Sequence, residues 1–366
     1  MAATIAVMKA AILKAFGTPL AIENVPDPVL GTGEVIVDVA AVGVQAYAGE
    51  VFSGKRNYPL ELPVIPGAGC VGRVRQTGPD ATRLKPGDWV LSDPTVRSRD
   101  DALSPDITLQ GVIAGSAQAL PLHRYFHDGS FAERIRVPTE NLTRLGDIDP
   151  AEAVRWCALG SMLVPYGGLH AVGLLAGETV AVNGATGAFG SAAVAVALAM
   201  GAGRVIATGR NQAALDELAR RSGSRVRPAR MEGDEERDRA RIVAAAAQPI
   251  DVVIDLLPPM ASVAQVRTAL LAVRPYGRVV LMGGVGMGGP GGLDLPYAWM
   301  MRNCITVRGQ WMYPRGAATR MIDMVRAGLL RLDGHDIATF PLDRANEAVA
   351  HAAIHTGPFR MTAICP

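Results

Sequence analysis

Hydrophobic and polar residues follow two different patterns along the chain. Up to about residue 130, short β-type runs are broken by glycine and proline, which is typical of a compact β-rich domain. From about residue 157 to 309, short apolar runs alternate with helical patterns, which predicts a parallel, doubly wound sheet. The strands expected there are 179–183, 204–208, 251–256 and 277–282, and the helices are 191–200, 212–221 and 262–273.

The last part of the chain returns to short, separate elements. Residues 310–366 contain a predicted helix at 317–328, a strand at 337–341, a helix at 343–356 and a strand at 360–364. We expect this part to complete the first domain. The stretch 227–241 is dense in both signs of charge, and we expect a solvated loop or helix face there.

A glycine-rich turn follows the first strand of the alternating region. Gly184, Gly187 and Gly190 leave room for a tight turn, for backbone close to a pyrophosphate, and for close packing of the next helix. The amides that open that helix would bind phosphate. The sequence therefore predicts a dinucleotide site in which the whole turn takes part: Gly184, Ala185, Thr186, Gly187, Ala188, Phe189 and Gly190. The alternative is a tight strand-to-helix turn without a ligand.

The end of the second strand predicts which dinucleotide binds. An acidic residue about twenty positions after the fingerprint normally holds the ribose 2′-hydroxyl of NAD. Here the chain has Thr208, Gly209 and Arg210, with no carboxylate. Because a guanidinium binds a 2′-phosphate that a carboxylate would repel, these three residues favour NADP(H) over NAD. The alternative is that Arg210 is a solvated surface charge that binds no ligand.

Composition narrows the class of protein further. A chain of 366 residues, 49% of them hydrophobic and with a formal charge of +2, indicates two globular domains and gives no reason to expect nucleic acid or a membrane as partner. Lys9 and Lys14 interrupt the apolar N-terminus, so we expect no signal peptide and a cytoplasmic location. The cysteines form no C-x-x-C pair, which argues against structural zinc and disulfides: Cys70, Cys157, Cys304 and Cys365.

Taken together, these motifs resemble the medium-chain dehydrogenase/reductase superfamily from Met8 to Ile364. The order of the short motifs carries the resemblance: Lys9-Ala10, Gly33-Glu34-Val35, Val64 to Gly69, Leu84 to Asp88, Gly129 to Glu133, Arg274 to Val279, and Gly283-Gly284. The resemblance implies an α/β protein with a Rossmann cofactor domain at 157–309. A discontinuous GroES-like catalytic domain would comprise 1–156 and 310–366, with a small-molecule site in the cleft between the domains. It also implies a homodimer or homotetramer, for which residues 306–309 are the expected edge strand.

The same resemblance allows a test for catalytic zinc. Zinc members of the family bind the metal through three ligands, typically Cys, His and Cys. The matching positions here are Gln45, Ala68 and approximately Ser161, which are poor or impossible ligands. The span from Gly184 to Gly190 is one residue longer than in the zinc enzymes, which resembles the zinc-free quinone oxidoreductase branch. We therefore expect no bound metal.

A zinc-free reductase needs an acceptor that its own conjugation activates, such as a quinone or an α,β-unsaturated ketone. The protein must align the reactants and donate a hydrogen bond to the oxygen that becomes negative. Tyr47 matches the position of a hydroxyl residue in the family's proton relay, so the resemblance makes it the candidate donor, although a packed structural tyrosine is the alternative. Gln45 matches an asparagine near the nicotinamide, and the backbone of Gly283, Gly284 and Val285 is expected to pass near that ring.

For the other candidate residues, the sequence gives weaker evidence of a chemical role. His123 and His127 lie in a segment that either covers the site or forms a loop, and the loop is favoured. His170 is expected to be a structural residue of a helix. Tyr58, Trp311 and Tyr313 either line the acceptor site or pack as core.

Two classes of function remain open from the sequence. The first is an NADPH-dependent, zinc-independent reductase of quinones or enones, or an alcohol dehydrogenase-like reductase of another carbonyl compound. The second is a protein that binds NADPH as a sensor or interaction module with little turnover, because a fold does not fix a function.

Overall fold

A computed structural model describes residues 6–287 and 292–366, and these residues divide into two compact units. Unit 1 comprises the chain up to Gly160 together with His335–Thr356 and Met361–Pro366. Unit 2 comprises Ser161–Gly334 and Gly357–Arg360. None of the helices in these described ranges is long and apolar enough to cross a membrane.

The division differs from the sequence-based boundary at residue 309, because 310–334 belong to unit 2. A Cβ atom on Gly167 would lie 2.3 Å from the carbonyl oxygen of Met312 and 2.8 Å from Cα of Tyr313. This stretch therefore packs directly against a helix of unit 2, and only the residues after it return to unit 1.

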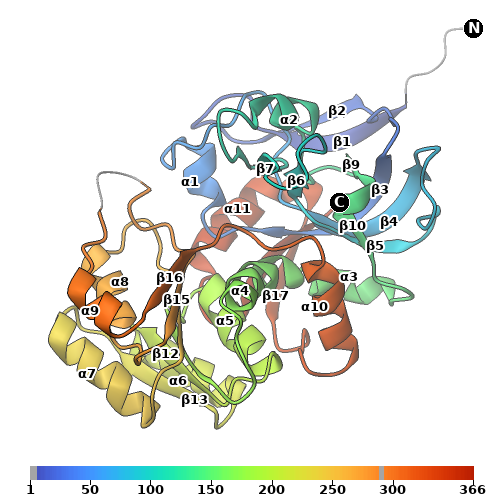
Figure 1. The fold of residues 1–366 in the computed structure, drawn as a ribbon. Helices are drawn as coiled ribbons and strands as arrows, with labels where there is room; N and C mark the ends of the chain where they lie inside the picture. The colour runs from blue at the N-terminus through green and yellow to red at the C-terminus, as the bar shows by residue number, and fades with distance from the viewer. Residues whose placement is uncertain (1–5, 288–291) are drawn as a thin grey trace, which may run out of the picture. The chain divides into compact units, whose positions relative to one another are not determined.

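Unit 2 is built around a six-stranded parallel sheet in the order β13-β12-β11-β14-β15-β16 (Figure 1). Its strands are β11 (Thr179–Asn183), β12 (Arg204–Gly209), β13 (Val226–Arg230), β14 (Val252–Asp255), β15 (Arg278–Leu281) and β16 (Thr306–Gly309). The helices are α4 (Leu159–Ala171), α5 (Ala188–Ala199), α6 (Gln212–Ser222), α7 (Glu235–Ala246), α8 (Val263–Leu270), α9 (Tyr297–Arg302) and α10 (Ala317–Arg326). The predicted parallel, doubly wound sheet is confirmed.

The charged stretch 227–241 contains structure that the sequence did not predict. It contributes most of β13, the outermost strand, and the first part of α7. Val226 and Ala229 are buried on the strand, and Ile242 is buried on the helix. Because charged residues separate these few apolar positions, the strand pattern is weak, whereas the expected helix face is present.

Unit 1 is an antiparallel β structure. Its main sheet follows the order β10-β5-β4-β3-β18-β17, and β9 also pairs with β3. The strands of this sheet are β3 (Glu34–Val44), β4 (Cys70–Thr77), β5 (Trp89–Ser92), β9 (Arg134–Pro138), β10 (Leu142–Arg144), β17 (Asp336–Pro341) and β18 (Arg360–Cys365). Smaller sheets pair β1 (Val7–Ile12) with β2 (Ala21–Pro26), and β6 (Thr95–Arg97), β7 (Ile107–Leu109) and β8 (Ile113–Ala114). The helices are α1 (Ala48–Phe52), α2 (Leu120–Tyr125), α3 (Ala153–Trp156) and α11 (Ala345–Ile354).

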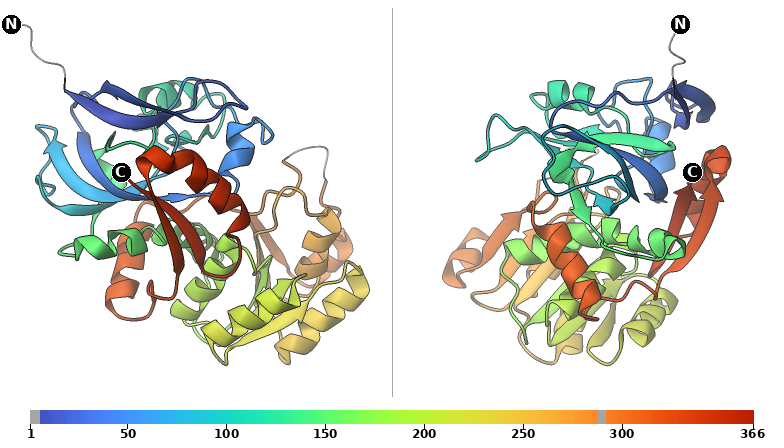
Figure 2. Two further views of the ribbon diagram at one scale, coloured as in Figure 1. Left: turned by 180° about the vertical axis from the view of Figure 1, so that it is seen from behind. Right: turned by 90° about the vertical axis from the view of Figure 1, so that its right-hand side faces the viewer.

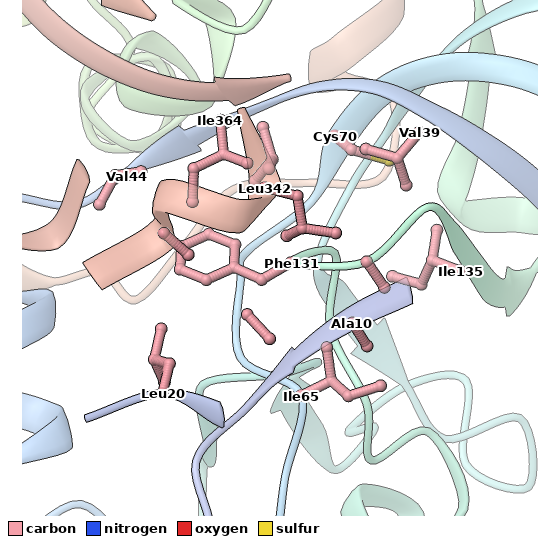
Figure 3. Packing of buried hydrophobic residues seen from close by; sticks show 14 of the residues in the cluster. Ala10, Leu20, Val39, Val44, Ile65, Cys70, Phe131, Ile135, Leu342 and Ile364 are labelled. Atoms are coloured by element: carbon pink, nitrogen blue, oxygen red, sulfur yellow. The ribbon is translucent and has the colours of Figure 1, made fainter. Parts of the chain in front are cut away.

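The core of unit 1 joins residues from the two ends of the chain. Phe131 lies at its centre, fully buried, with its ring edge-to-face against Phe52 at 6.5 Å (Figure 3). Leu342 and Ile364 reach this core from the C-terminal segment, and Ala10 reaches it from the first strand. In Figure 2 the C-terminal helix α11 lies beside the strands that precede and follow it.

Candidate cofactor site

The glycine turn joins β11 to α5 at the carboxyl edge of the parallel sheet. Gly184 has φ +86°, a conformation that L side chains rarely adopt. A Cβ on Gly190 would lie 2.0 Å from the carbonyl oxygen of Gly184, whereas a Cβ on Gly187 would meet nothing within 4 Å. Gly190 therefore lets the helix pack on the turn, and Gly187 faces open space.

The first turn of α5 is the part of this loop suited to phosphate. The N-cap residue of the helix is Gly187, which has no side chain with which to cap the first-turn amides. Ala188 and Phe189 begin the helix there. On the other side of the turn, the amide of Ala185 donates to the carbonyl oxygen of Thr208 at 2.9 Å, which fixes the turn to β12.

At Gly209, the end of β12, the structure leaves no room for an acidic side chain like the one that holds the ribose in NAD-binding sites. A Cβ on Gly209 would lie 2.9 Å from Cγ2 of Thr186, so the threonine covers this position. Thr208 is buried, and its hydroxyl lies 3.0 Å from Oδ1 of Asn183 and 3.2 Å from the carbonyl oxygen of Val182. Its side chain thus ties β12 to β11 and is not presented to solvent.

Arg210 is an exposed charged residue at this edge. Among residues 6–287 and 292–366, no carboxylate forms an ion pair with its guanidinium. Because both this charge and the adjacent edge of the turn are open, a phosphate placed there would meet a free guanidinium.

A buried polar network beneath the turn was missed by the sequence analysis. Nδ2 of Asn183 donates to Oδ1 of Asp255 at 2.7 Å and to the carbonyl oxygen of Gln265 at 3.3 Å. Asp255 is 3% exposed, and burial raises the pKa of its carboxyl group to about 6, although hydrogen bonds from Asn183 and the Leu257 amide favour the charged form. The available signal was that two buried apolar strands each end in a polar residue.

The residues after β15 pack onto the same network. A Cβ on Gly283 would lie 2.5 Å from Oδ2 of Asp255, and one on Gly284 would lie 2.8 Å from Cγ of Pro259. The amide of Gly284 donates to the carbonyl oxygen of Leu257 at 2.8 Å, and Val285 is partly buried. The glycine-rich segment predicted to pass near the nicotinamide extends from here to residue 292, and its residues 288–291 lie outside the described ranges.

Within unit 1, Tyr47 occupies the N-terminal boundary of α1 and is partly buried. The Arg56 guanidinium lies 4.1 Å above its ring centroid, and Nε of Arg56 donates to Oε2 of Glu50 at 2.8 Å. Burial raises the pKa of the Tyr47 phenol, Tyr58 raises it further, and Arg56 opposes this change. The phenol is therefore protonated at neutral pH.

Gln45, also partly buried, has its carbonyl oxygen hydrogen-bonded to the amide of Ala48 at 2.9 Å.

The histidines have structural partners. His123 is fully buried on α2, where its Nδ1 lies 2.6 Å from Oγ1 of Thr108, and burial lowers the pKa of the ring to about 4. Nδ1 of His127 lies 3.2 Å from Asp128, and the ring of His170 stacks on Tyr166 at 5.7 Å. His123 therefore lies in a helix and not in the favoured loop, whereas His127 follows that helix in irregular structure. Tyr313 is buried, whereas Trp311 is 47% exposed.

Two family models match the chain. The alcohol dehydrogenase GroES-like domain matches residues 31–147, and the zinc-binding dehydrogenase domain matches residues 188–327, so the two stretches make up more than half of the chain. The chain belongs to the medium-chain dehydrogenase/reductase superfamily. The predicted fold class, a Rossmann-like parallel sheet with a GroES-like domain, is confirmed.

Individual members of the superfamily resemble the chain over part of its length. An alcohol dehydrogenase of Rhizobium meliloti (strain 1021) is 34% identical over 53% of the chain and 55% of its own length. An acryloyl-coenzyme A reductase of Metallosphaera sedula is 31% identical over 53% of the chain and 57% of its own length. The matches thus span about half of each relative. A solved structure described as a zinc-binding dehydrogenase of Sinorhizobium meliloti 1021, bound to NADP, covers 99% of the chain and 100% of its own, with a TM-score of 0.76 at 21% identity.

The family model and the solved structure are described as zinc-binding dehydrogenases, but this chain lacks suitable zinc ligands at the matching positions. The positions that resemble the three ligands hold an amide at Gln45, a methyl group at Ala68 and a hydroxyl at Ser161. Among the residues that the structure describes, no three His, Cys, Asp or Glu side chains group as metal ligands. Cys70 and Cys157 are buried free thiols, and Cys304 is exposed. This donor set does not fit Zn²⁺.

Proposed function

We propose that the chain is an NADPH-dependent, zinc-independent oxidoreductase that reduces a conjugated carbonyl compound, a quinone or an enone. The observation that carries this proposal is the side-chain set at the positions that resemble the zinc ligands: Gln45, Ala68 and Ser161 do not fit Zn²⁺, and the phenol of Tyr47 follows Gln45 by two residues. The similarity to acryloyl-coenzyme A reductase supports an α,β-unsaturated acceptor, and the similarity to alcohol dehydrogenase supports carbonyl chemistry.

The choice of NADP(H) rests on the carboxyl edge of the unit 2 sheet. The chain has a glycine and no carboxylate at position 209, and Thr186 covers this glycine. Arg210 has an exposed guanidinium without an ion pair among the described residues. The turn from Gly184 to Gly190 would hold the pyrophosphate, and Arg210 would bind the 2′-phosphate. The structure related to this chain that binds NADP is consistent with this choice.

The chemical roles then divide between cofactor and protein. Bound NADPH would supply the hydride. Tyr47 would donate a hydrogen bond to the acceptor oxygen as negative charge develops on it, which lowers the barrier because the donor is already oriented. Gln45 would contact the cofactor through its amide, and the backbone at Gly283, Gly284 and Val285 would border the nicotinamide. No step in this scheme requires a metal.

The test is oxidation of NADPH, and of NADH in parallel, against 1,4-benzoquinone, 9,10-phenanthrenequinone and a simple enone in the presence of a chelator. We expect turnover with NADPH that survives the chelator and that Arg210→Ala weakens mainly through cofactor affinity. Tight NADPH binding without turnover would contradict the reductase and favour a cofactor-binding sensor.

We also propose that two copies of the chain pair through β16. This strand is at the edge of the unit 2 sheet, and three of its residues are exposed: Thr306, Arg308 and Gly309. An open edge of this kind can continue a sheet across a two-fold axis. Light scattering should give twice the mass of the chain, and Val307→Pro should give single copies, because proline removes a ladder hydrogen bond. A monomeric wild-type protein would contradict the pairing.

A further inference from the structure

A second arginine lies at the same edge of the sheet as Arg210. β12 and β13 run parallel, and their register places Gly209 opposite Arg230, the last residue of β13. The amide of Met231 donates to the carbonyl oxygen of Gly209 at 2.8 Å, which fixes the two strand ends together. Adjacent strands lie about 4.8 Å apart. The backbone of Arg230 therefore lies one strand spacing from Gly209, the residue that precedes Arg210.

Both arginines are exposed, and neither forms an ion pair with a carboxylate of the residues that the structure describes. The acidic groups that follow Arg230 are bound by other partners. Glu232 pairs with Nη2 of Arg241 at 2.6 Å, and Asp238 accepts the backbone amides of Glu232 and Gly233 at 2.9 and 2.8 Å. The pKa of Glu232 is lowered first by its hydrogen bond to Arg241, and the charge of Arg230 adds less. Arg230 therefore has a guanidinium available for an anion.

We propose that Arg230 and Arg210 together bind the 2′-phosphate of NADP(H). This inference rests on the cofactor choice proposed above and adds to it a specificity-determining residue on the outermost strand. A phosphate monoester carries a charge of about −1.5 to −2 at neutral pH and several acceptor oxygens, so two guanidinium groups match it better than one. The ribose 2′-hydroxyl of NAD(H) offers neither the charge nor the oxygens.

The test measures binding and not turnover. Dissociation constants for NADPH, NADH and 2′,5′-ADP are determined by calorimetry for the wild type and for Arg230→Ala, Arg230→Lys and Arg210→Ala. Arg227→Ala is the matched control, because Arg227 is exposed on the same strand, opposite Ile206, and its guanidinium binds the carbonyl oxygen of Ser224 at 2.6 Å. Thermal unfolding confirms that each variant is folded.

We expect Arg230→Ala to weaken NADPH and 2′,5′-ADP about tenfold and to leave NADH unchanged, with partial recovery in Arg230→Lys. The difference in NADPH affinity between the wild type and Arg230→Ala should become smaller at high salt, because salt screens exposed charges. Unchanged NADPH binding in Arg230→Ala, with weakened binding in Arg210→Ala, would overturn this inference alone. Equal loss of NADPH and NADH would overturn it too, since the effect would not involve the phosphate. A wild type that does not prefer NADPH over NADH would overturn the cofactor choice as well.

Discussion

The side-chain amide of Asn183 donates a 2.7 Å hydrogen bond to the carboxyl group of Asp255. It joins the ends of β11 and β14, and Thr208 extends it to β12 through its contact with Asn183. The polar network therefore ties together three adjacent strand ends directly below the glycine turn. A polar network of this kind fixes geometry when all of its members are satisfied, because each unpaired member would be costly in a buried site.

Asp255 makes the stability of the protein depend on pH. Burial raises the pKa of its carboxyl to about 6 in the folded protein, above the value of about 3.9 in an unfolded chain. Between these values the folded state holds a proton that the unfolded state has lost, so the contribution of this group is present at pH 4 and is lost as the pH rises through 6. We expect the free energy of unfolding of the wild type to fall by about 2 kcal/mol relative to Asp255→Asn between pH 4 and 7. Urea unfolding at four pH values checks this, and parallel curves would contradict it.

Two of the three glycines in the turn, Gly190 and Gly187, should respond differently to alanine. Gly190→Ala places a methyl group 2.0 Å from the carbonyl oxygen of Gly184, and backbone cannot move away cheaply. We expect a loss of about 1–3 kcal/mol of stability, together with weaker NADPH binding. Gly187→Ala meets nothing within 4 Å, so its melting temperature should equal that of the wild type. If Gly187→Ala nevertheless binds NADPH less tightly, the open space at this position is occupied by the cofactor.

Tyr47→Phe tests the proposed hydrogen-bond donor. The substitution keeps the ring beneath Arg56 and removes only the hydroxyl, so the packing of α1 should be unchanged. We expect kcat with quinone or enone to fall about 100-fold while the Kd for NADPH stays constant, because the hydroxyl acts on the developing charge. Tyr125→Phe, on the exposed surface of α2, is the control. If Tyr47→Phe instead lowers the free energy of unfolding and loses activity because less of it is folded, the tyrosine has a structural role.

Phe131 is the residue on which the core of unit 1 should depend most. Its side chain is 2% exposed and meets Phe52 edge-to-face. Phe131→Ala should cost about 3–5 kcal/mol of unfolding free energy, because the cavity cannot collapse fully. Phe16→Ala removes a ring that is 43% exposed and should cost about 1 kcal/mol or less. Thermal unfolding of both variants checks the difference, and equal melting temperatures would contradict it.

Periodicity predicted the parts of the fold in which burial is continuous. The strands at 179–183 and 204–208 lie in the middle of a parallel sheet, so their apolar runs are unbroken and their bounds agree closely with β11 and β12. β13 is an edge strand whose outward residues include Arg227 and Arg230, and its sequence resembles a charged loop. The structure divides the chain elsewhere than at residue 309 for a related reason: Met312 lies against Gly167, which is far away in the chain.

The candidate site was predictable where backbone geometry requires glycine. Gly184, Gly187 and Gly190 were found by spacing, and the structure gives each a separate environment. The polar residues that end the two apolar strands were a signal for Asn183 and Asp255, but the sequence does not show that these two side chains meet across the sheet. The position of Thr186 over Gly209 was equally hidden, since it depends on how the turn folds back on β12.

The way unit 1 draws on both ends of the chain affects the order of events during synthesis on the ribosome. β3 is complete at Val44, yet its neighbour β18 begins only at Arg360. At ordinary rates of translation β3 waits roughly half a minute for this partner, while the whole sheet of unit 2 emerges and can fold. The end of β3 at residues 42–44 is thus without its native neighbour during this interval, whereas β9 can already pair with Glu34–Asp38. Nascent chains released before Thr362 would keep this end of the strand open to other polypeptides.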